Sequence, residues 1–288
     1  MIRRPPRSTH CISSAASDVY KRQVFNRSLA KAEALEEFGA EIAKTVEELV
    51  KDSDVVITML TDDKAVDEVM SSSSFLENLK PGSIVIDMSS IKPVNAKKHA
   101  KNLSFNKIEY LDSPVSGGTI GAEEGSLAIM IGGEKKIFKE VEGLLKTMGN
   151  PTLVGPVGSG QVSKLANQII VGLTIGAVAE AVTLCEKAGA DPIKMIDALS
   201  GGWADSKVLQ THGKRMINKD FSPKGKTSTH LKDMKNILDC AKIHKIKLPL
   251  SNLIKKNYDK LVKNGFGNYD HSSIYKNYKK NLIRKEYE

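Results

Sequence analysis

Short apolar runs alternate with amphipathic segments over the first half of the chain. Residues 54–60 (DVVITML) and 83–88 (SIVIDM) are almost continuously apolar, which is typical of strands buried on both faces. Shorter strands are predicted at residues 24–26, 41–42, 109–111, 126–131 and 152–154. Helices are predicted between them at residues 30–38, 45–50, 64–70, 93–103 and 134–148. Strands that alternate with helices in this way predict an α/β fold with a Rossmann-like, doubly wound sheet.

The pattern changes after Gly155. A helix is predicted over residues 159–188, after an entry rich in glycine (Gly155, Gly158 and Gly160) and before Gly189. Its apolar residues cover more than one face, so we expect this helix to be buried on several sides. Further helices are predicted at residues 192–199, 207–217, 231–244, 250–264 and 272–284. We therefore predict a dinucleotide-binding domain at residues 24–155 and an all-α domain for substrate binding and oligomerisation at 156–288, joined by the long helix.

Composition excludes several classes of protein. The chain has 288 residues with 40% hydrophobic and 27% charged residues, as in ordinary globular proteins of two domains. Cys11, Cys185 and Cys240 lie far apart without a CxxC motif, which predicts no disulfide framework, no metal site and a reducing compartment. We find no apolar run that approaches the length of a membrane span, and we predict no membrane partner.

The net charge of +9 is spread along the chain. Residues 1–23 hold five basic side chains (Arg3, Arg4, Arg7, Lys21, Arg22) against Asp18, and so contribute +4 of this charge. Much of the rest is lysine scattered over the C-terminal half without interleaved aromatic residues. This distribution favours a solvated lysine-rich surface over a nucleic-acid groove. Salt-dependent binding of DNA would support the nucleic-acid alternative.

Residues 1–23 differ in composition from the rest of the chain. They are rich in arginine, serine and proline and lack the apolar core of a signal peptide. A mitochondrial transit peptide is one interpretation. A disordered or non-native leader, such as translated adapter sequence, is the one we favour for a reason given below. The corresponding predictions of location are the mitochondrion for the first and the cytoplasm for the second.

Polar side chains follow the predicted strands, where ligands bind in an open parallel sheet. Asn26, Arg27 and Ser28 follow the first strand and include no acid. An acid at this position binds the ribose of NAD, whereas an arginine accommodates the 2′-phosphate of NADP. The turn therefore indicates NADP, with NAD possible, if a nucleotide binds; an ordinary polar turn is the alternative.

Three further groups of residues are candidates for binding or catalysis. Met59 and Leu60 end one strand, and Ser90 follows the next, although strand ends and helix caps explain them equally well. Ser116, Gly117 and Gly118 offer a hydroxyl and backbone amides that can hold a carboxylate. Lys164 and Asn167 share one face of the long helix. Spacing alone favours a solvated lysine and a packing asparagine there.

Together these blocks resemble the β-hydroxyacid dehydrogenase family, which includes 3-hydroxyisobutyrate dehydrogenases and glyoxylate, succinic semialdehyde and tartronate semialdehyde reductases. The resemblance rests on residues 87–91 (DMSSI), 112–130 (DSPVSGGTIGAEEGSLAIM) and 158–167 (GSGQVSKLAN), in the family's order. It extends over residues 24–270. A 6-phosphogluconate dehydrogenase itself would need a longer helical domain.

The resemblance implies a role for each candidate. Lys164 matches the catalytic lysine and Asn167 the amide beside it, while Ser116, Gly117 and Gly118 match the loop that holds the substrate carboxylate. Met59 and Leu60 match the pair that lines the cofactor, and Ser90 matches the hydroxyl residue near the nicotinamide. Lys232 and Asp233 match the pair on a later helix that closes over the site. Without the resemblance, Lys232 and Asp233 are a plain exposed charged pair.

The chain departs from the family in two places. Residues 221–226 (FSPKGK) lack the second aromatic residue that usually lines the substrate side. The family also begins with a strand and Gly-x-Gly-x-x-Gly, which cradles the pyrophosphate, but residues 1–23 contain no glycine. We therefore expect a truncated coding sequence behind a foreign leader, and an inactive chain that binds NADPH weakly. Tight binding in a fluorescence titration would contradict this.

The activity that the resemblance implies is NADP-dependent reduction of a small aldehyde acid (glyoxylate, succinic semialdehyde or tartronate semialdehyde) to the hydroxy acid. The alternatives are a 3-hydroxyisobutyrate dehydrogenase and a non-catalytic dehydrogenase-like interaction module. Such modules usually lose the lysine, as imine reductases do, and Lys164 is present. A small carboxylate is the expected partner, and family analogy implies a homodimer or homotetramer.

Overall fold

The computed structural model describes residues 22–279, so most of the predicted leader at residues 1–23 lies outside the described residues. The chain divides into two compact units: the first ends at Lys164 and the second begins at Leu165. We predicted a boundary near Gly155, whereas the units divide inside the long helix α8 (Ser159–Ala188). Each unit is described by itself.

The first unit contains a mixed six-stranded sheet. Its strands are β3 (Val55–Thr58), β4 (Ile84–Asp87), β5 (Glu109–Asp112), β6 (Val115–Ser116), β7 (Leu127–Gly132) and β8 (Gly149–Gly155). The first three are parallel neighbours, β7 runs antiparallel to β5 and β6, and β8 is parallel to β7. The α/β class predicted from the apolar runs is confirmed, with β7 and β8 running opposite to the other four strands.

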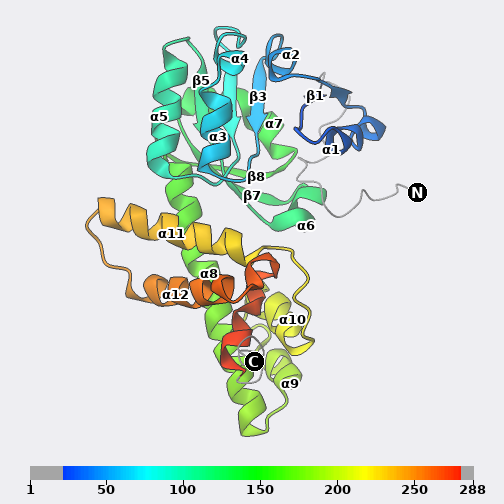
Figure 1. Cartoon of the computed structure of the whole chain (residues 1–288), viewed down its shortest axis with the longest axis vertical. Helices are drawn as coiled ribbons and strands as arrows, with labels where there is room; N and C mark the ends of the chain where they lie inside the picture. Colours follow the sequence, from blue (N-terminus) through cyan, green and yellow to red (C-terminus); the bar gives the residue numbers. More distant parts are fainter. Residues whose placement is uncertain (1–21, 280–288) are drawn as a thin grey trace. The chain divides into compact units, whose positions relative to one another are not determined.

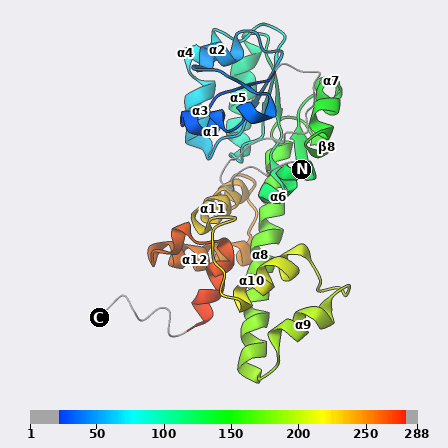
Figure 2. The same ribbon diagram turned by 90° about the vertical axis from the view of Figure 1, so that its right-hand side faces the viewer.

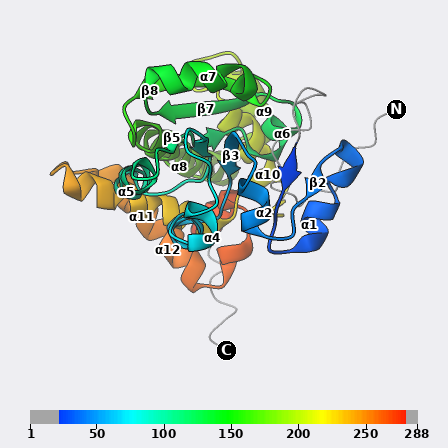
Figure 3. The same ribbon diagram turned by 90° about the horizontal axis from the view of Figure 1, so that it is seen from above.

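Helices cover both faces of this sheet (Figure 3). Those on one face are α2 (Val46–Val50), α3 (Asp63–Met70), α4 (Ser73–Leu76) and α5 (Pro93–Ser104), while α7 (Lys135–Lys146) covers the other. Val66, Phe75 and Leu103 pack with Val56 and Val85 of the strands on the first side. On the second side, the α7 residues Ile137, Phe138, Val141 and Leu145 are buried in one cluster with Ile86 and Leu111. Each sheet face is therefore apolar, which explains the unbroken apolar runs.

Side chains begin three of these helices as N-caps. The Thr45 hydroxyl accepts a hydrogen bond from Glu48 N, and the Glu48 carboxylate accepts one from Lys44 N. Asp62 accepts from Ala65 N, and Ser72 accepts from Phe75 N. Thr45 and Glu48 thus form a capping motif that begins α2, with the glutamate reaching one residue further back than in the usual capping box.

The N-terminal segment forms a small sheet of its own. β1 (Gln23–Val24) pairs in parallel with β2 (Glu41–Ile42) and with no strand of the larger sheet. The predicted helix at residues 30–38 is wrong, because α1 (Leu29–Glu33) is followed by a separate 3₁₀ helix, η1 (Glu36–Phe38). Only Ala32 of these two helices is buried, so little packing energy is available to hold one continuous helix.

The second unit is helical (Figures 1 and 2). Beside the rest of α8 it contains α9 (Pro192–Leu199), the π-helix η2 (Leu209–Gly213), α10 (Lys214–Ile217), α11 (Thr227–Ile243), α12 (Pro249–Lys263), η3 (Phe266–Asn268) and η4 (His271–Tyr278). Figure 1 shows α11 and α12 side by side. The core of this unit is built on buried Ile175, Ala179 and Val182 of α8, which pack with Ile196, Met234 and Tyr258.

Two local predictions were wrong. Residues 207–217 form no single α-helix, because the π-helix η2 precedes the short α10. The α-helix predicted at residues 272–284 is the 3₁₀ helix η4 as far as Tyr278, and residues 280–288 lie outside the described part. Ser116 and Gly117, the start of the predicted carboxylate-binding loop, lead directly into a helix, α6 (Gly118–Glu123).

The prediction that no apolar run approaches a membrane span is also wrong, since α8 is long and apolar enough by length and composition alone. Its most apolar stretch has a mean hydropathy of 1.8, and 33% of that stretch is buried. Core helices of soluble proteins meet the same criterion, and α8 has fully buried residues in the core of the second unit, such as Ile175. Length and composition are therefore weak evidence for a membrane span here.

Candidate active site

Polar side chains order the carboxyl ends of β3 and β4. The buried Asp87 carboxylate accepts hydrogen bonds from the Thr58 hydroxyl (2.8 Å), Ser89 N (3.0 Å) and the Tyr110 hydroxyl (3.3 Å). The Ser89 hydroxyl in turn accepts one from Leu60 N (2.9 Å). Burial raises the pKa of the Asp87 carboxyl, against these hydrogen bonds, which lower it. The segment that contains Met59 and Leu60 is thus tied to the turn that contains Ser89 and Ser90.

A second buried carboxylate, Asp112, lies at the end of β5 and holds the start of α8. Its two oxygens accept hydrogen bonds from Gly158 N (2.7 Å) and Gln161 N (2.8 Å). Burial raises the pKa of this carboxyl to about 7, although both amide hydrogen bonds lower it. The backbone approaches closely here: a Cβ on Gly160 would lie 2.4 Å from the carbonyl oxygens of Asp112 and Met130. Glycine is therefore required where α8 begins.

Lys164 lies on the second turn of α8 and is half-buried. Its ammonium donates a hydrogen bond to the carbonyl of Val115 (2.8 Å), the residue before Ser116. Gly117 and Gly118 follow with positive φ angles of 139° and 65°, and both are exposed. The first unit thus brings together Lys164 and the Ser116–Gly117–Gly118 loop, which are 46 or more residues apart in the sequence.

The remaining site candidates of α8 and α11 lie in the second unit. The Asn167 amide donates to the Gln168 side chain (2.9 Å), and Gln168 donates to the Asp233 carboxylate (2.6 Å). Lys232 lies 3.3 Å from the same carboxylate. Asp233 is only 3% exposed, so the description of Lys232 and Asp233 as a plain exposed pair is wrong. A buried carboxylate needs such partners, which indicates that this pair is organised rather than solvated.

The residues expected near a nicotinamide cofactor occupy accessible positions in the first unit. Asn26, Arg27 and Ser28 follow β1 and are exposed, and the Asn26 side chain accepts a hydrogen bond from Ser28 N (2.9 Å). Met59 is 37% exposed at the end of β3. The guanidinium and the apolar strand end suit a ribose phosphate and a nicotinamide ring, respectively. A Gly-x-Gly-x-x-Gly loop for the pyrophosphate does not occur in the described residues.

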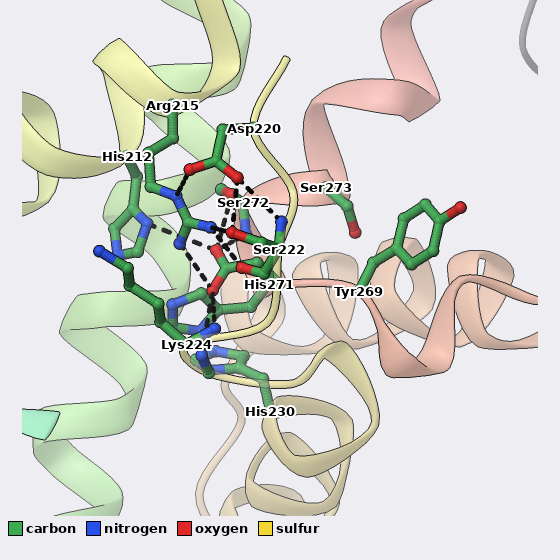
Figure 4. A network of polar contacts seen from close by, with 12 residues as sticks. His212, Arg215, Asp220, Ser222, Lys224, His230, Tyr269, His271, Ser272 and Ser273 are labelled. Atoms are coloured by element: carbon green, nitrogen blue, oxygen red, sulfur yellow. Dashed lines mark hydrogen bonds and ion pairs between the residues drawn. The ribbon is translucent and has the colours of Figure 1, made fainter. Parts of the chain in front are cut away.

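Figure 4 shows a polar cluster of the second unit that includes His212, Arg215 and His271. The cluster surrounds Asp270, which is fully buried. Its carboxylate pairs with Arg215 (2.9 Å) and accepts hydrogen bonds from the backbone of Lys224 (3.1 Å) and Gly225 (3.0 Å). Ser272 adds two more, from its backbone N–H (3.0 Å) and its hydroxyl (2.7 Å). These contacts fix residues 220–225, which include part of the segment that departs from the family.

His212 and His271 place ligand atoms within 4.8 Å of each other and of Asp270, as a metal site would require. Burial lowers the pKa of both imidazoles, that of His271 to about 3, so both are neutral at pH 7. The Asp270 oxygens, however, already receive five donors, and a cation would have to displace Arg215. We therefore interpret the cluster as an anchor for residues 220–225.

Gln161 is the residue that sequence reasoning missed. It is fully buried on the first turn of α8, and its side chain bonds to two backbone groups of the β4–α5 segment. The available signal was a glutamine on the first turn of the predicted helix, three residues before Lys164.

Comparisons with known proteins identify both halves of the chain. Residues 10–158 match the NAD binding domain of 6-phosphogluconate dehydrogenase, and residues 158–278 match the NAD-binding domain of NADP-dependent 3-hydroxyisobutyrate dehydrogenase. The 2-hydroxy-3-oxopropionate reductase of Escherichia coli K12 is 41% identical over 246 residues, 84% of each chain. The probable 3-hydroxyisobutyrate dehydrogenase-like 1 of Arabidopsis thaliana, a mitochondrial protein, is 34% identical over 86% of this chain and 75% of its own.

Among solved structures, the 3-hydroxyisobutyrate dehydrogenase of Salmonella typhimurium superimposes with a TM-score of 0.82 over 89% of this chain and 90% of its own. At 24% identity this likeness shows the fold alone. The sequence matches show more, because they include two relatives above 30% identity that cover most of the chain. The chain belongs to the β-hydroxyacid dehydrogenase family and is an NAD(P)-dependent oxidoreductase of small hydroxy acids.

Proposed function

We propose that the protein reduces a small aldehyde acid to the corresponding hydroxy acid with NADPH. The observation that carries this proposal is the hydrogen bond from the Lys164 ammonium to Val115 O (2.8 Å). It holds a proton donor next to Ser116, Gly117 and Gly118, whose hydroxyl and amides suit a carboxylate. Hydrogen-bond donors that can bind a carboxylate thus lie beside a proton donor. This arrangement fits a substrate that carries both a carboxylate and a carbonyl.

NADPH supplies the hydride to the carbonyl carbon. Lys164 gives a proton to the carbonyl oxygen as the C–H bond forms, so that the aldehyde becomes an alcohol. Ser116 and the amides of Gly117 and Gly118 hold the substrate carboxylate and thereby set the distance of the carbonyl from Lys164. Asn167 orients the lysine or the substrate oxygen. Lys232 and Asp233 complete the set of polar residues that we assign to the site.

The substrate that we propose first is 2-hydroxy-3-oxopropionate, the semialdehyde of tartronate, because the E. coli relative is named for its reduction. Glyoxylate and succinic semialdehyde carry the same two groups and are the next candidates. Oxidation of 3-hydroxyisobutyrate is the alternative, which the name of the Arabidopsis relative favours. These substrates differ mainly in the atoms between the carboxylate and the reacting carbon. Residues 221–226, which depart from the family on the substrate side, are therefore candidates for selecting among them.

The proposed cofactor is NADP. Arg27 is exposed directly after β1, and neither Asn26 nor Ser28 is an acid that would repel a 2′-phosphate. The family description that matches residues 158–278 is that of an NADP-dependent enzyme. Changing Arg27→Asp is expected to weaken NADPH binding about tenfold or more while sparing NADH, since a charge-assisted phosphate contact contributes about 1.5–3 kcal/mol.

We also propose a homo-oligomer that forms through the second unit. Ile170 and Leu184 of α8 are 68% and 69% exposed, and Leu250 and Leu253 of α12 are 63% and 57% exposed. Exposed large apolar side chains on two helices of one unit suit an interaction surface. Light scattering on the purified protein is expected to give the mass of a dimer or tetramer; a monomer with unchanged activity would contradict the proposal.

The location that we propose is the cytoplasm.

Turnover assays test the substrate and the cofactor together. We suggest a protein in which residues 1–23 are replaced by the strand, Gly-x-Gly-x-x-Gly loop and helix that begin the family, called here the glycine-loop protein. NADPH consumption is followed with 2-hydroxy-3-oxopropionate, glyoxylate, succinic semialdehyde and, in reverse, 3-hydroxyisobutyrate. The highest kcat/KM is expected with the first substrate and NADPH. A preference for 3-hydroxyisobutyrate or NADH would overturn the corresponding assignment, and no turnover with any of them would favour an interaction module.

A further inference from the structure

Gln161 joins two parts of the first unit that the proposed reaction needs in a fixed relation. Its side-chain amide donates to Ser89 O (2.8 Å), and its side-chain oxygen accepts from Ile91 N (3.1 Å). Its own backbone N–H donates to Asp112 (2.8 Å). The residue is 0% exposed, so water cannot replace any of these partners.

The turn that Gln161 holds also reaches the cofactor side of the sheet. The Ser89 hydroxyl accepts from Leu60 N (2.9 Å), and Ser89 N donates to Asp87 (3.0 Å). A continuous set of hydrogen bonds therefore runs from Leu60 through Ser89 to Gln161. Lys164 lies three residues further along α8, on the same side of the helix as Gln161 by i, i+3 spacing.

The start of α8 has no freedom to shift without breaking these contacts. Asp112 holds Gly158 N and Gln161 N at once, and Gly160 lies too close to the Asp112 and Met130 carbonyls for any side chain. Asp112 sets the position of the helix start along the sheet, whereas Gln161 connects it to the β4–α5 turn. Both constraints act on the backbone that carries Lys164.

We infer that Gln161 is a positioning residue for the proposed reaction: it sets the place of the Lys164 ammonium relative to the strand ends at Leu60 and Ser89. This inference rests on the proposed role of Lys164 as proton donor. In this role Gln161 does not contact the reacting groups. It acts only through the start of α8 and the β4–α5 turn. A displacement of about 1 Å at a reacting group costs about 100-fold in rate, so a small shift of α8 is enough to be measured.

Two substitutions in the glycine-loop protein separate positioning from packing. Gln161→Met keeps the side-chain volume and removes both side-chain hydrogen bonds. Its kcat is expected to fall about 100-fold, with little change in the KM of the aldehyde acid. Gln161→Glu keeps the acceptor for Ile91 N, but an ionised second oxygen would face the Ser89 carbonyl, where only a protonated carboxyl can donate.

The pH profile of Gln161→Glu is the decisive readout. Its kcat relative to the unsubstituted protein is expected to be close to one at the acidic end of the activity range and to fall about tenfold or more as the introduced carboxyl ionises. A residue that only fills space would give a constant ratio. Asn78→Leu, which removes a hydrogen bond to Ser74 O in the same unit, serves as the matched control: it lowers the melting temperature and leaves kcat unchanged.

The outcomes distinguish this inference from the proposed function. If Lys164→Ala abolishes turnover but Gln161→Glu keeps a constant ratio of kcat at every pH, the positioning role is wrong and the function stands. If Lys164→Ala retains turnover, the proposed function fails and the positioning role fails with it. A pH-dependent ratio for Gln161→Glu supports the inference even if Gln161→Met does not fold.

Discussion

One buried aspartate in each unit anchors a backbone segment, and the pKa values of the two carboxyls are shifted in opposite directions. Asp112 in the first unit and Asp270 in the second are both 0% exposed. Asp112 is held by two backbone amides, Gly158 N and Gln161 N. Asp270 has four hydrogen bonds and, in addition, an ion pair with Arg215. Asp270 therefore has two more hydrogen bonds than Asp112 and, in addition, a permanent cation beside it.

The pKa values follow this difference. Burial raises the pKa of the Asp112 carboxyl to about 7, since two amide hydrogen bonds offset only part of the lost hydration. Burial also raises the pKa of Asp270, but the His271 imidazole, the Ser272 hydroxyl and the surrounding amides outweigh it and hold this pKa well below its usual range. Arg215 acts in the same direction. Asp270 is therefore a permanent charge, whereas Asp112 changes its charge near neutral pH at the start of the helix that carries Lys164.

The largest expected effect comes from breaking the ion pair of the second unit. Asp270→Asn leaves the buried Arg215 guanidinium with only the exposed Asp220 carboxylate (3.3 Å) as an ion-pair partner, and is expected to lower the free energy of unfolding of this unit by about 3–5 kcal/mol. Hydrogen exchange measured by mass spectrometry reads the two units separately. Exchange that speeds up only in residues 165–279 would agree; equal stability of the variant would show that Asp270 does not carry the anchor.

Asp112→Asn is expected to change the pH dependence of the first unit. The folded pKa is raised, so the stabilisation is complete below the unfolded value near 3.9 and is lost as pH rises through about 7. The shift corresponds to roughly 4 kcal/mol at most. Urea titrations from pH 4 to 8 should show this fall in the unsubstituted protein and a flatter profile for Asp112→Asn. Parallel profiles would mean that Asp112 does not titrate in this window.

The second unit is expected to respond to pH in the opposite direction. Burial, with His230, His212 and Arg215 nearby, lowers the pKa of His271 to about 3 against the pull of Asp270. The unfolded chain takes up this proton near pH 6.5 and the folded unit does not, so stability is lost as pH falls from about 6.5 towards 3, by about 1.4 kcal/mol per pH unit for one proton. His271→Gln should reduce this slope in acid melting curves. An unchanged slope would assign the effect to other groups.

The smallest effect is expected from a half-buried carboxylate at the edge of an exposed ion pair in the same unit. Asp259 pairs with Lys263 four residues on (2.9 Å) at the surface of α12. Asp259→Asn is expected to cost about 0.2–1 kcal/mol in urea unfolding, because solvent screens such pairs. It is the control for Asp270→Asn, since both remove one carboxylate charge from an ion pair. A loss as large as that of Asp270→Asn would show that burial is not what separates the two.

The sequence predicts the fold well where residues pack against both sides of an element. The apolar runs at residues 54–60 and 83–88 are β3 and β4, and the glycine-rich entry and Gly189 bound α8 closely. It fails where packing is sparse or the backbone is irregular. Nothing local distinguishes the π-helix at Leu209–Gly213 or the 3₁₀ helix at His271–Tyr278 from an α-helix, because their contacts come from distant segments.

The candidate site shows the same limit. Spacing alone favoured a solvated Lys164, and only the resemblance to the family gave it a role. Its hydrogen bond to Val115 O spans 49 residues and cannot be read from local pattern. Local pattern gives no role to Asp112 or Gln161 either, because their partners lie 46 to 72 residues away. Long-range polar contacts of this kind are specified by the sheet topology rather than by neighbouring residues.

Turnover of Lys164→Ala in the glycine-loop protein tests the proposed chemistry most directly. NADPH affinity and kcat are measured for 2-hydroxy-3-oxopropionate with and without the substitution. Loss of the proton donor is expected to lower kcat about 10²–10⁴-fold while the dissociation constant of NADPH stays the same. A kcat within a few-fold of the unsubstituted protein would contradict the role of Lys164, and with it the assignment of the α8 start as the catalytic element.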